Sequence, residues 1–449
     1  MFALKRRFLG PAEVTGSGNH QKLGLIGYPN AGKSTLWNAL TNARMPSPAD
    51  DHLFCTLDVM MGHSHCPDSR LDWLASVYRA DHVTRIPVTV MDGPGIVSRS
   101  FFGDGEGLSF LSMYRDAEIF VNIVRGFDSI QITHYEDGKI DPVRDMKVPI
   151  NEMMHVDLHE ICKQLKTMER QLEDLRKEFA PVGRHLLIEV RTLIKAWECL
   201  VGCDRQEKNS EKLKEMKKQG IKLEAEKEIP EILQGIPLRF ATWSPVEVEI
   251  IKKYNFLSAK EMVYVLNVSP RDHVRGYSKW LEPMRAAIDK IGGGSLIHLS
   301  CHFEEELNRE LARGTMEAYA AANPTHKSAL PDLIFACTRA LDLITFYTFT
   351  EPTRELKAWV CRQGTTIKDA AGLVDYFLFR NFQRGEVYAY DDMVDFDGNF
   401  ERLDEFGKHR HQVKQYVVID GDIITFKAYD KSAGSPGKVS PTGKPAGLL

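Results

Sequence analysis

Residues 27 to 34, Gly-Tyr-Pro-Asn-Ala-Gly-Lys-Ser, constrain the fold of this chain more than any other part of its sequence. They match the P-loop pattern, in which glycines let backbone N–H groups wrap a phosphate and the next helix N-terminus adds its dipole. An apolar run at 23–27 precedes the loop, and apolar residues recur after it with helical spacing. This strand, loop and helix indicate a phosphate-binding site, although a glycine-rich structural turn would have a similar composition.

Three side chains of this loop are candidates for direct contacts. Lys33 would reach the β and γ phosphates of a nucleotide, and Ser34 would bind Mg²⁺ through its hydroxyl. The amide oxygen of Asn30 could help to coordinate K⁺ beside the phosphates, or the side chain could simply cap or shape the loop. The sequence favours neither role of Asn30 over the other.

An Asp-x-x-Gly pattern follows the apolar strand expected at 87–92. Asp92 would face the hydration shell of the metal, and the amide of Gly95 would read the γ phosphate. Thr56 lies between the P-loop and this pattern and is a candidate Mg²⁺ ligand from a mobile loop. The three elements in this order predict the scaffold of a switch GTPase.

Ile96 follows the Asp-x-x-Gly pattern, where hydrolytic GTPases usually carry a glutamine that orients the attacking water. Either another group places the water or intrinsic turnover is slow. Asn30 and Gly95 are the candidates for a catalytic contribution, and no catalytic base is assigned.

Base recognition is expected after the strand that ends at Asn267. The usual guanine signature is Asn-Lys-x-Asp, whereas this chain has Asn267-Val268-Ser269-Pro270 and therefore no carboxylate at the fourth position. Guanine donors would be left unpaired in such a site. The sequence thus favours ATP, with GTP as a second nucleotide. Ser300 and Cys301, after the next strand, would approach the base with backbone amides, or would form a plain junction between a strand and a loop.

The fold class is expected to be α/β. At 449 residues the chain exceeds the roughly 250 to 300 residues of a single core. Short apolar runs separated by helical segments predict a parallel sheet, and they lie at 23–27, 87–92, 118–124, 262–268 and 295–300.

Heptad spacing marks the segment between the third and fourth of these strands. Apolar residues repeat from Ile161 to Phe179 and from Leu186 to Leu200, with Pro181 and Gly183 between the two arms. This predicts an inserted antiparallel helical hairpin, with an ordinary helical subdomain as the alternative.

A helix followed by short strands predicts a small β-rich C-terminal domain from about residue 329. These strands are expected at 356–362, 387–393 and 415–429. The expected organisation is a flexible N-terminus (1–19), a nucleotide-binding domain (20–150 and 237–328), the helical insertion (151–236), the C-terminal domain with its preceding helix (329–430) and a disordered tail (431–449).

Net charge, apolar runs and cysteine pattern limit the partners and the cellular location that can be expected for this chain. The net charge of -4 indicates no polyanion partner for the whole chain, so a nucleic-acid surface would have to be a local patch, and no DNA partner is expected. No apolar run reaches the ~18 to 20 residues of a membrane span. The eight cysteines are scattered, which suits a reducing cytoplasm. The basic start, Lys5-Arg6-Arg7, is read as a frayed terminus and not as a targeting leader.

Two smaller clusters are interpreted as structural. His63, His65 and Cys66 lack a spaced second half of a zinc site and are expected in a turn. Cys199 and Cys203 are expected to be packing residues.

Five segments together resemble one family, the YchF proteins or Obg-like ATPases, over roughly residues 20 to 430. They are GYPNAGKSTLWNALTNA, FCTLD, ITHYEDGKIDPVRD, VYVLNVSPRDHVRGYSKWL and YVVIDGDIITFKAY. The resemblance implies an OBG-type G domain, a β-grasp-like C-terminal TGS domain, hydrolysis of ATP in preference to GTP, and association with ribosomes. It implies nucleotide or Mg²⁺ contacts at the residues from Gly27 to Thr35, which include Asn30, Ala31, Gly32, Lys33 and Ser34, and at Thr56, Asp92, Gly95 and Asn267.

The chain also departs from the pattern of that family. The family usually has glutamate where this chain has Pro270, and histidine where it has Asn122 and Asp375. The region from 98 to 112 differs as well and is two residues shorter. The expected function is a Mg²⁺-dependent ATPase switch with a ribosomal or RNA-bearing partner. A nucleotide-stabilised scaffold with weak catalysis is the alternative, and a small-molecule kinase fits less well.

Overall fold

The structure is a computed structural model that describes residues 21–41, 60–97, 111, 113–128, 139–177, 183–202 and 233–429. These residues form two compact units. The first unit holds the described residues of 22–62 and 90–329, and the second holds Gln21, 63–89 and 330–429. The sequence placed 20–150 in one domain, so the assignment of 63–89 to the second unit differs from that expectation. Thr56, Cys203 and the segment 98–110 lie outside the described residues.

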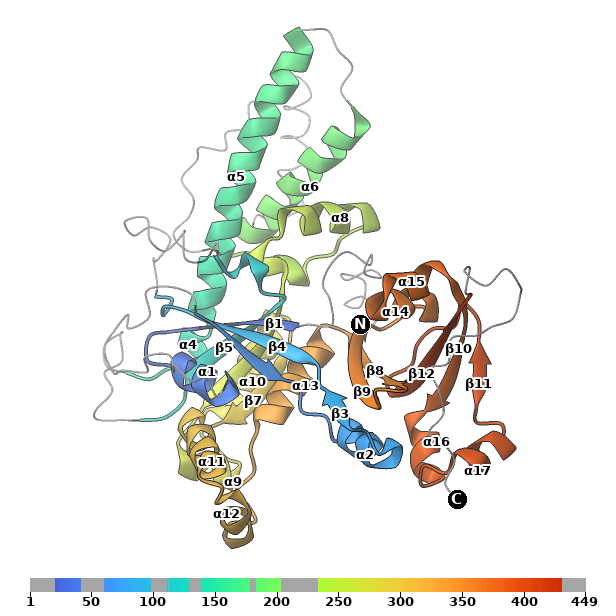
Figure 1. Ribbon diagram of the computed structural model, residues 1–449. Helices are drawn as coiled ribbons and strands as arrows, with labels where there is room; N and C mark the ends of the chain where they lie inside the picture. Colours follow the sequence, from blue (N-terminus) through green and yellow to red (C-terminus); the bar gives the residue numbers. More distant parts are fainter. Residues whose placement is uncertain are drawn as a thin grey trace. The chain divides into compact units, whose positions relative to one another are not determined.

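A six-stranded sheet organises the first unit, in the order β2-β4-β1-β5-β6-β7 (Figure 1). The pairs β1/β5, β5/β6 and β6/β7 are parallel. All five apolar runs expected as strands are strands, whereas the polar strand β2 was missed. The strands are β1 (Gln21–Gly27), β2 (Met60–His65), β4 (Pro87–Asp92), β5 (Ile119–Arg125), β6 (Glu261–Asn267) and β7 (Ser295–Leu299).

Helices connect and cover these strands, so the strand ends that carry the P-loop and the base-recognition stretch face a common edge. They are α1 (Lys33–Thr41), α4 (Pro142–Asp145), α9 (Pro270–Arg275), α10 (Leu281–Ile291), α11 (Cys301–Arg313) and α12 (Met316–Ala322), with short 3₁₀ turns η2 (Tyr114–Asp116), η3 (Leu238–Phe240) and η4 (Leu257–Ala259).

The expected helical hairpin is present as α5 (Lys147–Lys177) and α6 (Arg184–Val201), which run as two long arms and are followed by α8 (Pro245–Tyr254) (Figure 1). The heptad positions face inward: Ile161, Leu165, Met168, Leu172, Val190, Leu193 and Leu200 are buried in one apolar cluster. This inward face is why the spacing predicted the hairpin. The first arm begins at Lys147, before the expected boundary at 151.

The second unit is built on a mixed sheet in the order β11-β10-β12-β8-β9-β3. The pairs β8/β9 and β10/β12 are antiparallel, and β12/β8 is parallel. Helix α14 (Ile367–Val374) packs on this sheet through Ile367, Ala370 and Ala371. The strands of this part are β8 (Leu343–Thr350), β9 (Glu355–Arg362), β10 (Phe382–Ala389), β11 (Arg410–Gln412) and β12 (Asp422–Ala428), and the other helices are α13 (Leu330–Ala340), α15 (Tyr376–Arg380), α16 (Tyr390–Asp395) and α17 (Phe400–Glu405).

Two details of this unit correct the sequence prediction. The strand expected at 387–393 ends at Ala389, and α16 follows from Tyr390. The helix expected before the strands was predicted to run from 330 to 344, but it ends at Ala340, and β8 begins at Leu343. At the helix end the apolar residues Leu341, Leu343 and Ile344 continue across the change of element, whereas after Ala389 the chain turns polar at Asp391 and Asp392.

A short segment between the P-loop and Asp92 completes the second unit. Helix α2 (Ser69–Tyr78) and strand β3 (His82–Thr84) belong to it, and β3 pairs in parallel with β9. The carboxylate of Asp68 caps α2 and accepts a hydrogen bond from the Tyr347 hydroxyl at 2.5 Å. Tyr78 is buried against Phe349, with ring centroids 4.7 Å apart. Sequence position alone could not show these contacts.

Candidate nucleotide-binding site

The backbone of the P-loop needs its glycines. Gly27 has a φ of +150°, and a Cβ there would lie 2.3 Å from the carbonyl oxygen of Ile123. Gly32 has a φ of +102°, and its Cβ would lie 2.3 Å from the side-chain nitrogen of Asn267. Both positions combine a left-handed backbone with close approach of a neighbouring strand. The loop geometry is therefore imposed by β5 and β6 as well as by its own sequence.

Asn30 lies at the turn of this loop with a φ of +58°. Asparagine is among the few non-glycine residues that adopt the left-handed region readily. This observation supports the loop-shaping role of Asn30 that the sequence left open. It leaves K⁺ coordination by the side chain as a prediction.

Lys33 begins α1 and is buried, with 6% of its surface exposed. Its ammonium group donates a hydrogen bond to the carbonyl oxygen of Tyr28 at 2.9 Å, across the turn of the loop. The cation is thus held over the concave side of the backbone that a phosphate would occupy.

Ser34 and Asp92 lie in direct contact. The Ser34 hydroxyl donates to Oδ2 of Asp92 at 2.7 Å, and Asp92 is fully buried at the end of β4. The sequence placed both at the Mg²⁺ site, and the fold brings together residues 58 positions apart. A hydroxyl and a carboxylate are oxygen ligands of the kind that Mg²⁺ prefers.

The Asp-x-x-Gly segment is attached to the start of the P-loop. The amide of Ile96 donates to the carbonyl oxygen of Gly27 at 3.0 Å. A Cβ on Gly95 would lie 2.5 Å from the backbone nitrogen of Pro29, so the two loops touch. The Ile96 side chain is 1% exposed and belongs to the apolar core. Its side chain is directed into the core, so it is a packing residue at the position of the usual glutamine.

Asn267 joins three segments of the site. Its amide nitrogen donates to the carbonyl oxygen of Ala31 at 2.8 Å, and its amide oxygen accepts from the backbone N–H of Cys301 at 3.0 Å. Its own carbonyl oxygen accepts from the amide of Gly126 at 2.8 Å. Asn267 therefore connects the P-loop to the segments that follow β5 and β7. Gly126 was missed in the sequence, and its only signal is its place directly after β5.

Ser300 and Cys301 are structural in this arrangement. The Ser300 hydroxyl accepts from the amide of Phe303 at 3.4 Å and caps α11. The Cys301 amide is bound to Asn267, which supports the alternative of a plain junction after the strand, and base contact by these two residues stays a prediction. The amide of Val268 donates to the carbonyl oxygen of Leu299 at 2.9 Å. Burial raises the pKa of the Cys301 thiol, which keeps it neutral.

The position of the missing guanine acceptor begins α9. Pro270 is the first residue of that helix, and Ser269 is its N-cap. The carboxylate of Asp272, the nearest acid that follows Asn267 in the sequence, accepts from the Ser269 hydroxyl at 2.8 Å. This carboxylate is engaged in the helix cap and does not stand in for the missing one.

Asn122 departs from the resembled family and lies on β5, in register with Ile26 of β1. It is fully buried on β5, and its amide nitrogen donates to the carbonyl oxygen of Met146 at 2.9 Å. Met146 directly precedes α5. Asn122 therefore links β5 to the root of the helical hairpin.

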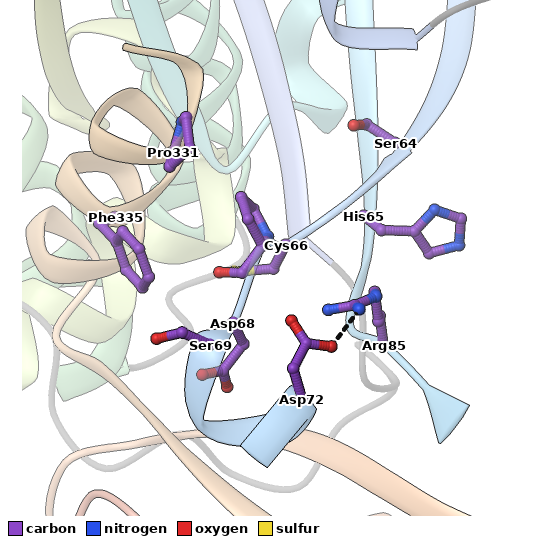
Figure 2. A pocket seen from close by; sticks show the side chains of 10 residues that line it. Ser64, His65, Cys66, Asp68, Ser69, Asp72, Arg85, Pro331 and Phe335 are labelled. Carbon is purple, nitrogen blue, oxygen red and sulfur yellow. Dashed lines mark hydrogen bonds and ion pairs between the residues drawn. The ribbon is translucent and has the colours of Figure 1, made fainter. Parts of the chain in front are cut away.

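The predicted histidine and cysteine clusters have structural surroundings. His63 and His65 lie on strand β2, which ends at His65, and not in a turn. Figure 2 shows His65 and Cys66 at a pocket of the second unit beside Asp72 and Arg85, which are paired at 2.5 Å. Burial raises the pKa of Cys66 to about 12. Among the described residues no group of three or more His, Cys, Asp or Glu side chains could hold a metal.

Comparison with known families and proteins matches both units. Residues 22–174 match the MMR_HSR1 model, described as a 50S ribosome-binding GTPase. Residues 343–429 match the YchF-GTPase_C model, described as a protein of unknown function (DUF933). None of the described helices is long and apolar enough to cross a membrane.

Relatives extend this similarity to nearly the whole chain. Obg-like ATPase 1 of Homo sapiens is 33% identical over 419 residues, which cover 91% of this chain and 93% of the relative. Obg-like ATPase 1 of Oryza sativa subsp. japonica is 30% identical over 409 residues, 91% and 92% of the two chains. The solved YchF GTPase of Schizosaccharomyces pombe is 28% identical, with a TM-score of 0.66 over 93% of this chain and all of that one.

The expected fold class, with its P-loop α/β domain and β-rich C-terminal domain, is confirmed. The P-loop geometry, the paired Ser34 and Asp92 and the relatives agree, and the chain belongs to the YchF family of Obg-like ATPases and is a P-loop NTPase.

Proposed function

We propose that this protein is a Mg²⁺-dependent switch that hydrolyses ATP in preference to GTP. The observation that carries the proposal is the Ser34–Asp92 contact beneath the P-loop, with Lys33 held over the loop. In the proposed site Ser34, Thr56 and Asp92 would hold Mg²⁺, which would neutralise charge on the phosphate oxygens. The amides from Asn30 to Thr35 and that of Gly95 bind the phosphates.

Hydrolysis in this site would be slow without a partner. A water oxygen would attack the γ phosphorus, the bond to the bridging oxygen would break, and ADP and phosphate would leave with release of one proton. Ile96 is buried, so its side chain does not orient that water. Electrostatic stabilisation by Lys33 and the loop amides remains, and glutamine-bearing GTPases turn over at only about 10⁻⁴ to 10⁻³ per second unaided.

The preference for ATP follows from the base side of the site. Pro270 supplies neither a carboxylate nor an N–H, and Asp272 is engaged by Ser269. A guanine base would leave its two donors unpaired in this site, and this desolvation weakens its binding. An adenine base lacks this pair of donors, so its binding does not carry the same cost. Asn267 and Val268 would border the base.

The partner class is proposed from the family. The matching family model is described as ribosome-binding, and the resembled family associates with ribosomes, so we propose a ribosomal or RNA-bearing partner in the cytoplasm. K⁺ at Asn30 is proposed as a second cation. A scaffold with weak catalysis is the second candidate, favoured by the buried Ile96.

Calorimetric titration with ATP and GTP in the presence of Mg²⁺, followed by single-turnover hydrolysis in K⁺ and in Na⁺, tests the proposal. We expect tighter ATP binding and slow, cation-sensitive hydrolysis. Tight binding without turnover would favour the scaffold, and no binding would overturn the proposal.

Substitutions locate the site within the same assay. Lys33→Ala and Ser34→Ala should abolish binding of the Mg-nucleotide, while the exposed pair Lys163→Ala and Ser76→Ala should leave it unchanged. Pro270→Asp should raise GTP affinity relative to ATP. An unchanged ratio would place the base elsewhere.

A further inference from the structure

Two histidines from neighbouring elements of the first unit lie side by side. His273 comes from α9 and His298 from β7, and their ring centroids are 6.2 Å apart with 23° between the ring planes. The His273 ring also contacts the ring of Phe303 on α11, at a centroid distance of 4.8 Å. The two histidines thus connect α9, β7 and α11, which are drawn close together in Figure 1.

Each ring has one buried nitrogen without a hydrogen-bond partner among the described residues, namely Nδ1 of His273 and Nε2 of His298. The other nitrogen of His273, Nε2, lies 3.1 Å from the carbonyl oxygen of Lys327. A carbonyl oxygen can only accept, so Nε2 of His273 carries a hydrogen and donates it. In a neutral His273 ring, Nδ1 therefore holds a lone pair and no hydrogen. These surroundings suit a neutral imidazole.

Protonation of either ring would be unfavourable in this arrangement. A protonated imidazole carries an N–H on both nitrogens, so it would bury a charged donor that has no acceptor. Two positively charged rings at this distance would also repel each other. Burial and the His273 charge accordingly lower the pKa of His298, although the Asp272 charge acts in the opposite direction. The contact between the rings is therefore favoured when both are neutral.

Two carboxylates lie near the pair, and both are engaged elsewhere. The Asp272 carboxylate accepts from the Ser269 hydroxyl at 2.8 Å. Glu304 on α11 is 1% exposed, and its carboxylate accepts from the Ser328 hydroxyl and from the Ala329 amide, each at 2.7 Å. Burial raises the pKa of Glu304, so this carboxylate loses its charge, and its attraction for a charged ring, more readily than an exposed glutamate does.

The other ionisable groups around the pair are basic. His326 contacts Phe303 with ring centroids 5.4 Å apart, and its Nδ1 lies 2.7 Å from the Tyr319 hydroxyl. The exposed cations of α9 and of the segment before α13 are Arg271, Arg275 and Lys327. Additional positive charge on His273 or His298 is opposed by all of these groups when they are charged.

The two histidines are close in sequence to the residues that organise the base side of the nucleotide site. Helix α9 begins at Pro270, three residues after Asn267, and His298 lies three residues before Cys301. The Asn267 side chain accepts the Cys301 amide at 3.0 Å and donates to the carbonyl oxygen of Ala31 in the P-loop at 2.8 Å. A displacement of α9 from β7 would therefore disturb the segment that connects the base side to the P-loop.

We propose that His273 and His298, here called the histidine pair, form a pH-sensitive contact that positions the base side of the nucleotide site, so that mild acid weakens ATP binding. When both rings are neutral, α9 stays packed on β7 and α11, and Asn267 keeps its contacts. Protonation of either ring favours an opened contact in which water can reach the ring nitrogens. The inference rests on the proposed placement of the base beside Asn267 and Val268.

The direction of the effect follows from the lowered pKa of His298. The closed contact binds a proton less readily than an opened one, in which histidine has its ordinary pKa of about 6.5. The stabilising contribution of the closed contact is therefore complete above about pH 6.5 and is lost as the pH falls below that value. Binding of ATP, which favours the closed contact, should in turn release protons in this range of pH.

The first test is calorimetric titration of the full chain with Mg-ATP at about pH 8 and at about pH 5.5. The comparison is with His273→Phe/His298→Phe, which keeps two rings in contact but cannot be protonated. From the higher to the lower pH, the affinity of the unaltered chain relative to this variant should fall by about three- to tenfold, because a group with a pKa of about 6.5 is about 90% protonated at pH 5.5. The ratio cancels the titration of the nucleotide phosphates and of Asp157, which both proteins share.

His302→Phe is the matched control. His302 lies on α11 next to Phe303, but its side chain is exposed and lies 3.4 Å from Glu306. This variant removes one titrating histidine from the same region and should keep the pH dependence of the unaltered chain. If His302→Phe loses that dependence as the double variant does, the effect comes from general surface charge, and the proposal is overturned.

A second measurement counts protons directly. Calorimetry at about pH 6 in two buffers of different ionisation enthalpy gives the number of protons released when ATP binds. The unaltered chain should release more protons than His273→Phe/His298→Phe, or than His298→Gln if the double variant does not fold. Equal proton release, or an equal dependence of ATP affinity on pH, would overturn the proposal. Absence of ATP binding by the unaltered chain at about pH 8 would instead overturn the proposed function, so the two failures are distinct.

Discussion

The side-chain amide of Asn267 donates a hydrogen bond to the carbonyl oxygen of Ala31 at 2.8 Å, so strand β6 holds the P-loop in place. The same side chain accepts the amide of Cys301. A residue that the sequence marked as a base contact therefore also organises the phosphate site. Base-side and phosphate-side changes in this protein are expected to be coupled through it.

Asn267→Ala should weaken binding of both ATP and GTP by at least about tenfold. The variant leaves the Ala31 carbonyl and the Cys301 amide without their buried partner, which costs about 1–3 kcal/mol for each group. Calorimetric titration measures the effect. Asn308→Ala removes a comparable bond, to the carbonyl oxygen of Ala39, and serves as the control that should keep affinity. Equal losses in the two variants would contradict this role of Asn267.

Ile96→Gln should lower stability and give no faster hydrolysis. The side chain is 1% exposed in an apolar core, and burying an amide there without partners costs about 1–3 kcal/mol. Chemical denaturation and single-turnover hydrolysis measure the two effects. Ile96→Val, a control that keeps the site apolar, should cost about 0.5–1.5 kcal/mol. Faster hydrolysis by the glutamine variant would show that position 96 reaches the attacking water.

Tyr78→Ala should destabilise the second unit although Tyr78 lies between the P-loop and Asp92 in the sequence. Its ring is buried against Phe349 and Phe400, and removal of a large buried aromatic costs about 3–5 kcal/mol. Hydrogen exchange should show lost protection in β8 and β9. Ser76→Ala, at an exposed position of the same helix, should leave protection unchanged. Lost protection confined to the first unit would refute the assignment of this segment.

Asp157 should make stability depend on pH. Burial raises its pKa from 3.8 to about 6, against the opposing effect of hydrogen bonds from the amides of Ser258 and Leu257 and of the Arg115 charge. The folded state then binds the proton more tightly than the unfolded state, so this carboxyl adds stability as pH falls from about 6 towards 4.

Urea denaturation of the unaltered chain and of Asp157→Asn at several pH values isolates this effect. The difference in unfolding free energy between the two should grow in favour of the unaltered chain as pH is lowered from 7 to about 4. A difference that is constant or shrinks over this range would mean that the carboxyl remains ionised in the folded state. Lys260, whose pKa burial lowers to about 8, titrates mainly above this window.

The sequence alone determined those elements whose motif or repeat lies within one continuous stretch of the chain. The P-loop from Gly27 to Ser34, the strand that ends at Asp92 and the heptads of α5 and α6 each have a pattern that a single element must satisfy, and all were predicted. The expected helix ran past its end at Ala340 because apolar residues continue into β8, and the expected strand ran past its end at Ala389 into the residues that begin α16.

Only the tertiary structure decided which residues far apart in the sequence come into contact. The pairing of β3 with β9, the contact of Asp68 with Tyr347 and the clamp of Asn267 on Ala31 join residues more than two hundred positions apart. The tertiary structure also shows that the Ile96 side chain packs in the apolar core. It shows that the Asn122 side chain is bonded to the carbonyl oxygen of Met146 at the root of the helical hairpin. Periodicity records which face of an element is apolar, but it holds no information about which other segment covers that face, because packing depends on the whole chain at once.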